Sequence, residues 1–171
     1  MNVLKVKFKQ AIFLKKLKMP INQSIKQQLF QQCEAYVAQK IAAAQKGMQD
    51  AQNAANNETK SSVGDKYETG RAMMHLEKNK YAIQLGEAIQ LKQQLSEITP
   101  TKHCEVVENS SLIKTNKGNF YIAISLGKVA LEGEKYYVVS LASPLGKALY
   151  QSKKGDSVAF RNIKYQILEL V

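Results

Sequence analysis

The stretch LKQQLSEITPTKHCEVVENSSLIKT, residues 91–115, contains the point at which the sequence changes its hydrophobic period. Before Pro100, apolar residues recur at intervals of three, four and seven residues, which is typical of helices that bury one narrow face. After Pro100, short runs rich in Val, Ile, Tyr and Phe alternate with polar residues, which is typical of strands. Proline stops the helical pattern because it lacks a backbone N–H. We therefore predict an α+β chain, with helices before residue 100 and a sheet after it.

Two long helical segments are predicted before Pro100. In the first, residues 21–57, small or apolar residues mark one face: Ile25, Leu29, Cys33, Tyr36, Val37, Ile41, Ala44, Met48, Ala51 and Ala55. In the second, a narrow stripe consists of Tyr67, Met74, Tyr81, Ala88 and Leu95, widened by Leu85 and Leu91. Each narrow stripe needs a partner, and the nearest one in sequence is the other helix. We predict an antiparallel two-helix coiled-coil finger, with a self-associated bundle as the alternative.

The region after Pro100 predicts a compact, mainly antiparallel β domain. Its predicted strands are SSLIKT, GNFYIAIS, EKYYVVSL, DSVAF and KYQILEL, separated by the turn signals NKG, EGE and KKGD. SPLGKALYQ predicts one short helix, because Ser143 can cap it and Pro144 suits its first position. The expected domains are a basic extension (1–20), a helical hairpin (21–100) and a β domain (101–171).

The net charge of +11 is unevenly spread, because residues 1–20 hold six lysines and no acidic residue. The apolar run AIFL in this segment is too short for a signal peptide. The segment is interpreted either as an arm that contacts nucleic acid or an anionic surface, or as an extension without structure of its own; we favour the extension, and Met19 is a possible start of the chain. No apolar run approaches the roughly 20 residues of a membrane span, so no membrane association is expected.

The cysteines and histidines form no recognisable site in the sequence. Cys33 and Cys104 lack CxxC spacing, so we expect free thiols in a reducing cytoplasm. His75 and His103 have no cluster of further ligands around them, and we expect neither a metal nor a catalytic role for them. No glycine-rich phosphate loop is present.

Between the two helical segments, SSVGDKYETG (61–70) places the carboxylates Asp65 and Glu68 directly after Gly64. One interpretation is an ordinary helix start, with Asp65 as the cap and Glu68 closing a capping box. The other is that the pair serves a chemical function, since a spacing of three residues puts both groups on one side of the first helical turn.

The order of elements and two motifs resemble the bacterial Gre transcript cleavage factors, which join a coiled-coil finger to an FKBP-like domain. SPLGKALYQSKKGDSVAF, followed by KYQILEL, resembles the family's serine-proline-hydrophobic-glycine helix, its glycine-aspartate turn and its last strand. GDKYE resembles the family's finger tip, in which a Gly-Asp is followed three residues later by Glu. The resemblance covers residues 21–171.

The resemblance implies a monomeric, cytoplasmic partner of RNA polymerase that is not itself an enzyme and has no cofactor of its own. Its finger would enter the secondary channel, where Asp65 and Glu68 would help to hold a magnesium ion of the polymerase active site and orient a water against the backtracked RNA. The chain departs from the family after Glu68, where the family has an Asn-Ala-Glu-Tyr type of run and this chain reads Thr69, Gly70, Arg71 and Ala72. A secondary-channel regulator without cleavage activity is therefore an alternative.

Further contacts with the polymerase or with nascent RNA are expected at Tyr67, Arg71, Ser143, Pro144, Lys147, Lys153 and Lys154. Together with Lys114, Lys117 and Arg161, the lysines of the β domain could form a basic face for RNA, DNA or an acidic polymerase surface. The alternative is a solvated lysine-rich exterior. A basic nucleic-acid-binding protein therefore remains a further hypothesis, whereas prolyl isomerase activity would rest on fold analogy alone.

Overall fold

The structure, a computed structural model, describes residues 21–58 and 64–171, and for residues 21, 22, 57, 58, 64–69 and 71 it describes only the helical backbone. The predicted extension and residues 59–63, which join the two helices, lie outside the described residues. The chain forms two compact units. One contains the beginning of the first helix, up to Cys33, together with Ile98–Val171, and the other is Glu34–Glu97. The predicted domain boundaries at residues 20 and 100 stay predictions.

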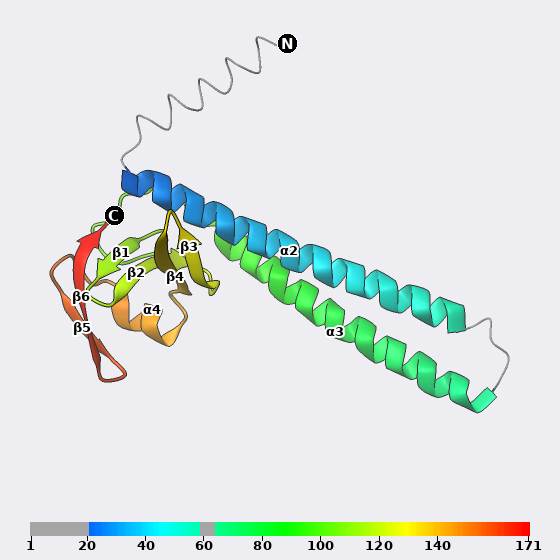
Figure 1. Ribbon diagram of the computed structural model, residues 1–171. Coiled ribbons are helices and arrows are strands. Elements are labelled where there is room, and N and C mark those ends of the chain that lie inside the picture. Colours follow the sequence, from blue (N-terminus) through cyan, green and yellow to red (C-terminus); the bar gives the residue numbers. More distant parts are fainter. Residues whose placement is uncertain (1–20, 59–63) are drawn as a thin grey trace, which may run out of the picture. The chain divides into compact units, whose positions relative to one another are not determined.

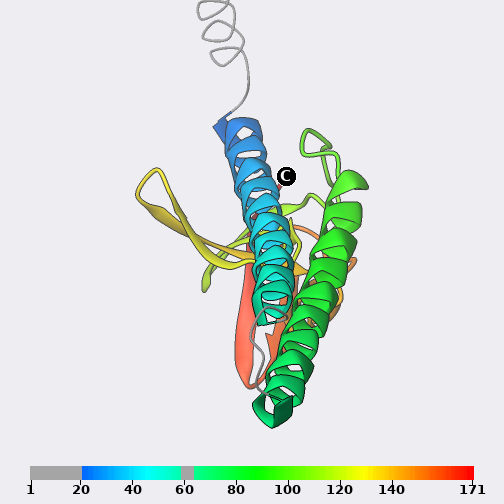
Figure 2. The ribbon, with the colours of Figure 1, turned by 90° about the vertical axis from the view of Figure 1, so that its right-hand side faces the viewer.

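The unit Glu34–Glu97 is a hairpin of two helices, α2 (Ile21–Glu58) and α3 (Gly64–Ser96), which lie side by side in Figures 1 and 2. The predicted stripe is confirmed in the described residues, since its members are all buried or half-buried. The fully covered positions are Val37, Ala44, Ala51, Ala88 and Leu95. Small side chains at the seam let the two helix backbones approach closely. No described helix is long and apolar enough to cross a membrane.

Two contacts show how closely the helices of the hairpin pack. Gly47 lies directly against the ring of Tyr81, so that a methyl group at this position would collide with the ring. Nearer the tip, the Nζ atom of Lys78 donates a hydrogen bond of 2.6 Å to Oε1 of Gln52. The seam is thus built from small residues and polar cross-links, with little large apolar surface.

The sheet has six strands in the order β3-β4-β2-β1-β6-β5. Their bounds are β1 (Leu112–Thr115), β2 (Gly118–Ala123), β3 (Gly127–Leu131), β4 (Glu134–Ser140), β5 (Ser157–Phe160) and β6 (Ile163–Leu170), with the short helix α4 (Pro144–Leu149) between β4 and β5. Every neighbouring pair is antiparallel except β2 and β4, which are parallel. The expected α+β class, mainly antiparallel sheet and single short helix are therefore confirmed (Figure 1). Strand β3 was not predicted, because at this edge of the sheet its side chains are at most half-buried and its alternation is weak.

Both faces of the sheet are covered. On one face, α4 contributes Leu149 to a core with Ile113, Phe120, Ile122 and Ile167. The first turns of α2 cover the other face. Leu29 and Cys33 of α2 are fully buried there, and so are Tyr121 of β2 and Val138 of β4. This arrangement follows from the period of two along each strand, which sends Ile122 to one face and Tyr121 to the other. Cys33 and Cys104 are both buried free thiols.

The second face holds a buried charge. Lys26 of α2 is 0% exposed, and its Nζ atom donates hydrogen bonds to the backbone oxygens of Lys102 and of Val171, the latter at 3.1 Å. Burial lowers the pKa of Lys26, although nearby Cys104 and Glu108 act in the opposite direction. The side chain ties the beginning of α2 to two segments that lie far away in the sequence.

We expect the stability difference between the wild type and a Lys26→Met variant to depend on pH. The folded-state pKa of Lys26 lies below its unfolded value of about 10.4. The unfolded chain therefore binds more protons than the folded chain between the two pKa values, and the wild type gains stability relative to the variant as pH rises through this window. Urea unfolding at several pH values measures this difference, with exposed Lys46→Met as the control. A relative loss of wild-type stability on raising the pH would contradict a lowered pKa of Lys26 in the folded chain.

Candidate functional site

The predicted tip residues lie at the beginning of α3. This helix begins at Gly64, so Asp65, Tyr67, Glu68 and Arg71 all fall within its first turns. Asp65 is thus the second residue of the helix, whereas the capping interpretation required it to lie immediately before the helix. For these four residues the structure describes the helical backbone and not the side chains. Their predicted roles in metal binding and in contacts with polymerase and RNA remain predictions.

The serine-proline-leucine-glycine motif builds the beginning of α4. The Oγ atom of Ser143 accepts a hydrogen bond of 3.0 Å from the backbone N–H of Gly146 and donates one of 2.6 Å to the carbonyl of Ser140. Pro144 occupies the first helical position and is exposed. Gly146 packs against the backbone of Ser140, where no Cβ would fit. Ser143 and Gly146 therefore have structural roles that account for the motif, while Pro144 remains available to a partner.

The predicted basic residues of the β domain are exposed but are spread over several elements. Lys147 belongs to α4 and, with Leu141, Ala142 and Tyr150, lines a shallow hollow. Lys153 and Lys154 lie in the turn before β5, where the carboxylate of Asp156 accepts a hydrogen bond from the backbone N–H of Lys153 at 2.7 Å. The remaining members are exposed as well and lie on other segments: Lys114 on β1, Lys117 in the turn that follows it, and Arg161 between β5 and β6. The three predicted contact lysines of α4 and its following turn remain candidates for a partner surface.

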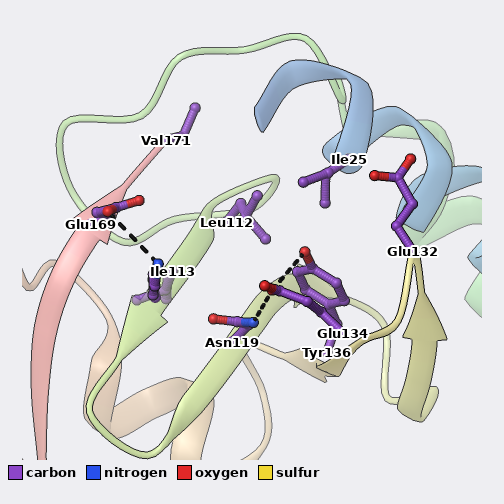
Figure 3. A pocket seen from close by; sticks show the side chains of 10 residues that line it. Ile25, Leu112, Ile113, Asn119, Glu132, Glu134, Tyr136, Glu169 and Val171 are labelled. Atoms are coloured by element: carbon purple, nitrogen blue, oxygen red, sulfur yellow. Dashed lines mark hydrogen bonds and ion pairs between the residues drawn. The ribbon is translucent and has the colours of Figure 1, made fainter. Parts of the chain in front are cut away.

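A cavity of about 290 Å³ lies on the sheet face that the start of α2 covers (Figure 3). The register of four neighbouring strands places a row of polar side chains along it. Lys114 of β1 pairs with Glu169 of β6. Lys114 also pairs with Asn119 of β2, which pairs in turn with Tyr136 of β4. Glu134 precedes Tyr136 by two residues and so lies on the same face of the sheet.

Hydrogen bonds hold two of the three carboxylates of this cavity in place, and the third forms an ion pair. The Oε2 atom of Glu134 accepts hydrogen bonds from Nδ2 of Asn119 at 3.0 Å and from the hydroxyl of Tyr136 at 3.4 Å. Glu132 lies in the tight turn between β3 and β4, and its Oε1 atom accepts a hydrogen bond of 3.0 Å from Gln28. Glu169, at the other side of the cavity in Figure 3, is 3.9 Å from Nζ of Lys114.

The cavity is negative although the chain as a whole is strongly positive. It is lined by the three glutamates Glu132, Glu134 and Glu169 but by a single lysine. Burial raises the pKa of Tyr136, and the neighbouring charges of Glu134 and Glu132 raise it further. No three described Asp, Glu, His or Cys side chains converge in the manner of a metal site.

The sequence did not predict this cavity. Glu132 and Glu134 belong to EGE, and this motif by itself indicates only a turn. The alternation of Glu134 and Tyr136 placed them on one face, but their neighbours depend on the parallel pairing of β2 with β4, which joins strands that are not consecutive. His75 and His103 are exposed and line neither of the two hollows described above.

Three places on the chain are thus candidates for function: the tip of the hairpin, the exposed surface around α4 and the acidic cavity. The first two were predicted from the sequence, and the third follows from the strand register. Comparisons with protein-family models, with curated proteins and with solved structures found no match to this chain.

Proposed function

We propose that this chain is a transcription elongation factor that binds RNA polymerase as a monomer in the cytoplasm. In this proposal, the helical hairpin enters the secondary channel, and Asp65 and Glu68 promote cleavage of the 3′ RNA in backtracked complexes. The polymerase supplies the magnesium ion, for which carboxylate oxygens are suitable ligands. The chain is then a factor that stimulates a reaction of the polymerase and not an enzyme in its own right.

The observation that carries the proposal is the hairpin itself, whose second helix begins with the two tip carboxylates. Helix α3 has 33 residues and, at 1.5 Å per residue, extends about 50 Å. A seam of alanines and glycine keeps the hairpin slender, as Ala44, Ala51 and Gly47 illustrate. A long, slender hairpin suits a narrow channel, and the position of its acidic pair suits delivery to a metal at the end of that channel.

The β domain supports the same proposal in a weaker way. Its six-stranded mixed sheet with one short helix is compatible with the FKBP-like domain that we propose for residues 101–171. In this proposal the domain docks on the outside of the polymerase, through the exposed residues Pro144 and Lys147 and the lysines at 153 and 154. Fold analogy by itself assigns no prolyl isomerase activity.

The proposal is tested with stalled, backtracked polymerase complexes of defined RNA length. The chain is expected to co-elute with polymerase at moderate salt and to shorten the transcript in the presence of magnesium. If the chain binds but no shortened transcript forms at any magnesium concentration, it is a secondary-channel regulator without cleavage activity. If it fails to bind polymerase but binds free RNA or DNA in a strongly salt-dependent manner, the nucleic-acid-binding alternative is favoured.

A specific observation favours a second candidate, a self-associating coiled-coil protein. Met73, Leu76 and Ile83 of α3 are 61%, 69% and 66% exposed, and their spacing of three and seven residues puts them on one helix face. Such a face could be covered by a second hairpin as well as by a channel wall. Sedimentation equilibrium distinguishes the two, because a concentration-dependent dimer that is abolished by Leu76→Gln and Ile83→Gln would favour self-association.

A further inference from the structure

The face of the sheet opposite the acidic cavity carries a row of aromatic side chains that α4 does not fully cover. In the middle of the row, the ring of Phe120 stacks on that of Tyr137, with ring centroids 5.5 Å apart and 29° between the ring planes. On its other side, Phe120 meets the ring of Tyr165 edge-on at 5.9 Å. Phe120 is covered, but Tyr165 is half-buried and Tyr137 is 38% exposed. The row therefore presents tyrosine surface to solvent.

The strand register positions this row. Tyr137 pairs with Phe120 across the parallel strands β4 and β2. Gly118, two residues before Phe120, makes room for the ring of Tyr137, since a Cβ atom at this glycine would lie 3.3 Å from the ring. Neighbouring strands lie about 4.8 Å apart, so the row from β4 over β2 and β1 to β6 spans about 14 Å. Because the rings stand on paired strands, they are held in place before any ligand arrives.

The charges of the strands are divided between the two faces of the sheet. Lys128 of β3 pairs directly with Tyr137, and Lys135 precedes Tyr137 by two residues, so both exposed lysines lie on the aromatic face. Within the six strands, which the structure describes in full, the only acidic residues are Glu134 and Glu169, and both line the cavity on the opposite face. A polyanion on the aromatic face therefore meets lysines and no carboxylate of the strands.

A further cation lies beyond Tyr165. Arg161, in the turn between β5 and β6, has its Cζ atom 5.3 Å from the ring centroid of Phe160. Phe160 pairs with Ile163, which precedes Tyr165 by two residues, so this ring also lies on the aromatic face. The φ angle of Arg161 is 48°, a left-handed conformation that residues other than glycine adopt only rarely. Its exposed guanidinium group adds positive charge on this side of the sheet.

Exposed rings next to cations are the features with which proteins bind single-stranded nucleic acids. Nucleobases stack on aromatic side chains, while lysine and arginine contact the phosphates between them. A duplex suits such a row poorly, because its bases are already stacked on one another and paired. Aromatic rings on a sheet can stack two or three unpaired bases, which agrees with the length of the row.

We propose that this aromatic face binds single-stranded RNA, with one base stacked on Tyr137 and neighbouring phosphates at Lys128 and Lys135. The choice of RNA over DNA rests on the proposed function, in which the chain works beside nascent RNA. The stacking surface itself rests only on the residues of the sheet, and the tip carboxylates take no part in it.

The test measures binding of a fluorescein-labelled 12-nucleotide oligouridylate by fluorescence anisotropy, without polymerase. The parent protein is the full-length chain with the six lysines of residues 1–20 replaced by serine, so that this segment adds no positive charge. The replaced residues are Lys5, Lys7, Lys9, Lys15, Lys16 and Lys18. The parent is expected to bind the RNA, with an affinity whose logarithm falls linearly with the logarithm of the salt concentration.

Replacement of the exposed ring tests the stacking. Tyr137→Leu should weaken binding about tenfold, because one base loses the ring on which it stacks, and should leave the salt dependence unchanged. Tyr137→Phe retains the ring and should bind like the parent. Tyr150→Leu is the matched control, since Tyr150 is 51% exposed but lies at the end of α4, outside the row. It should leave the affinity unchanged, and the dispersion of amide resonances in NMR spectra checks that each variant folds.

Two lysine variants compare the faces of the sheet. Lys135 and Lys164 are both exposed strand residues, but Lys164 alternates with Tyr165 and so lies on the opposite face. Lys135→Gln should reduce the slope of log affinity against log salt concentration by about 0.7, the value for one phosphate contact of a single strand. Lys164→Gln should leave the slope unchanged.

The proposal is overturned if the parent does not bind the RNA, if Tyr137→Leu binds as tightly as the parent, or if the two lysine variants change the slope equally. Tighter binding of the oligodeoxyuridylate of the same length overturns the assignment to RNA, whereas equal or weaker binding supports it. Because the assay contains no polymerase, its failure is distinct from a failure of the chain to co-elute with polymerase.

Discussion

The double replacement Asp65→Ala and Glu68→Ala is expected to reduce transcript cleavage in backtracked complexes by at least about 100-fold, which corresponds to about 3 kcal/mol of transition-state stabilisation. In our proposal the two carboxylates help to hold a catalytic magnesium and to orient the attacking water, so their loss acts on the reaction itself. Affinity for polymerase should change little, because the rest of the hairpin and the β domain would still make their contacts. Gel analysis of labelled RNA and co-elution measure the two quantities separately.

Two further variants separate metal binding from helix capping. Asn and Gln retain hydrogen-bonding oxygens but lose the negative charge, so Asp65→Asn with Glu68→Gln should keep hydrogen bonds that these side chains make at the start of α3 and still lose cleavage. Asp50→Ala with Glu77→Ala removes the same charge from exposed positions on the helix body and should leave cleavage intact. If the alanine variant cleaves normally and loses only about 1 kcal/mol of stability, the carboxylates have no role beyond beginning the helix.

The sequence predicted the helical hairpin well because within the unit Glu34–Glu97 the two helices pack on each other. The narrow stripe from Val37 to Ala51 is buried or half-buried as predicted, whereas Met73 and Leu76 of α3, which lie outside the predicted stripe, are exposed. Pro100 marked the change of period to within a few residues of the end of α3 at Ser96. Local signals suffice for such elements, since caps and periodicity act over a few residues.

Five of the six strands were predicted from the sequence, but their order in the sheet was not. The parallel pairing of β2 and β4 skips a strand, and no local pattern specifies it. The cavity could not be predicted for this reason, because Glu169, Asn119 and Glu134 become neighbours only through that strand order. The burial of Lys26 was likewise unexpected, since its partners are backbone oxygens of distant segments that carry no sequence signal.

Gly146→Ala is expected to destabilise the β domain by about 3 kcal/mol, the upper end of the usual cost of overpacking. A Cβ atom at this position would overlap the carbonyl oxygen of Ser140 and would lie 2.9 Å from Cα of Leu141. These are backbone atoms, which cannot move aside in the way that the end of a flexible side chain can. The same displacement would disturb the cap, because the N–H of Gly146 donates to Ser143. Urea unfolding followed by tyrosine fluorescence measures the loss.

Gly86→Ala provides the matched control, because the same methyl group meets a different environment. Gly86 lies within α3, and no atom lies within 4 Å of the position that its Cβ would take. Alanine is favoured over glycine by up to about 1 kcal/mol inside a helix, so this variant should stabilise the hairpin. If Gly146→Ala, like the control, causes no loss in the free energy of unfolding, packing does not require the glycine of the motif. The glycine would then be explained by a partner that contacts the backbone of α4. Polymerase binding by Gly146→Ala tests this explanation.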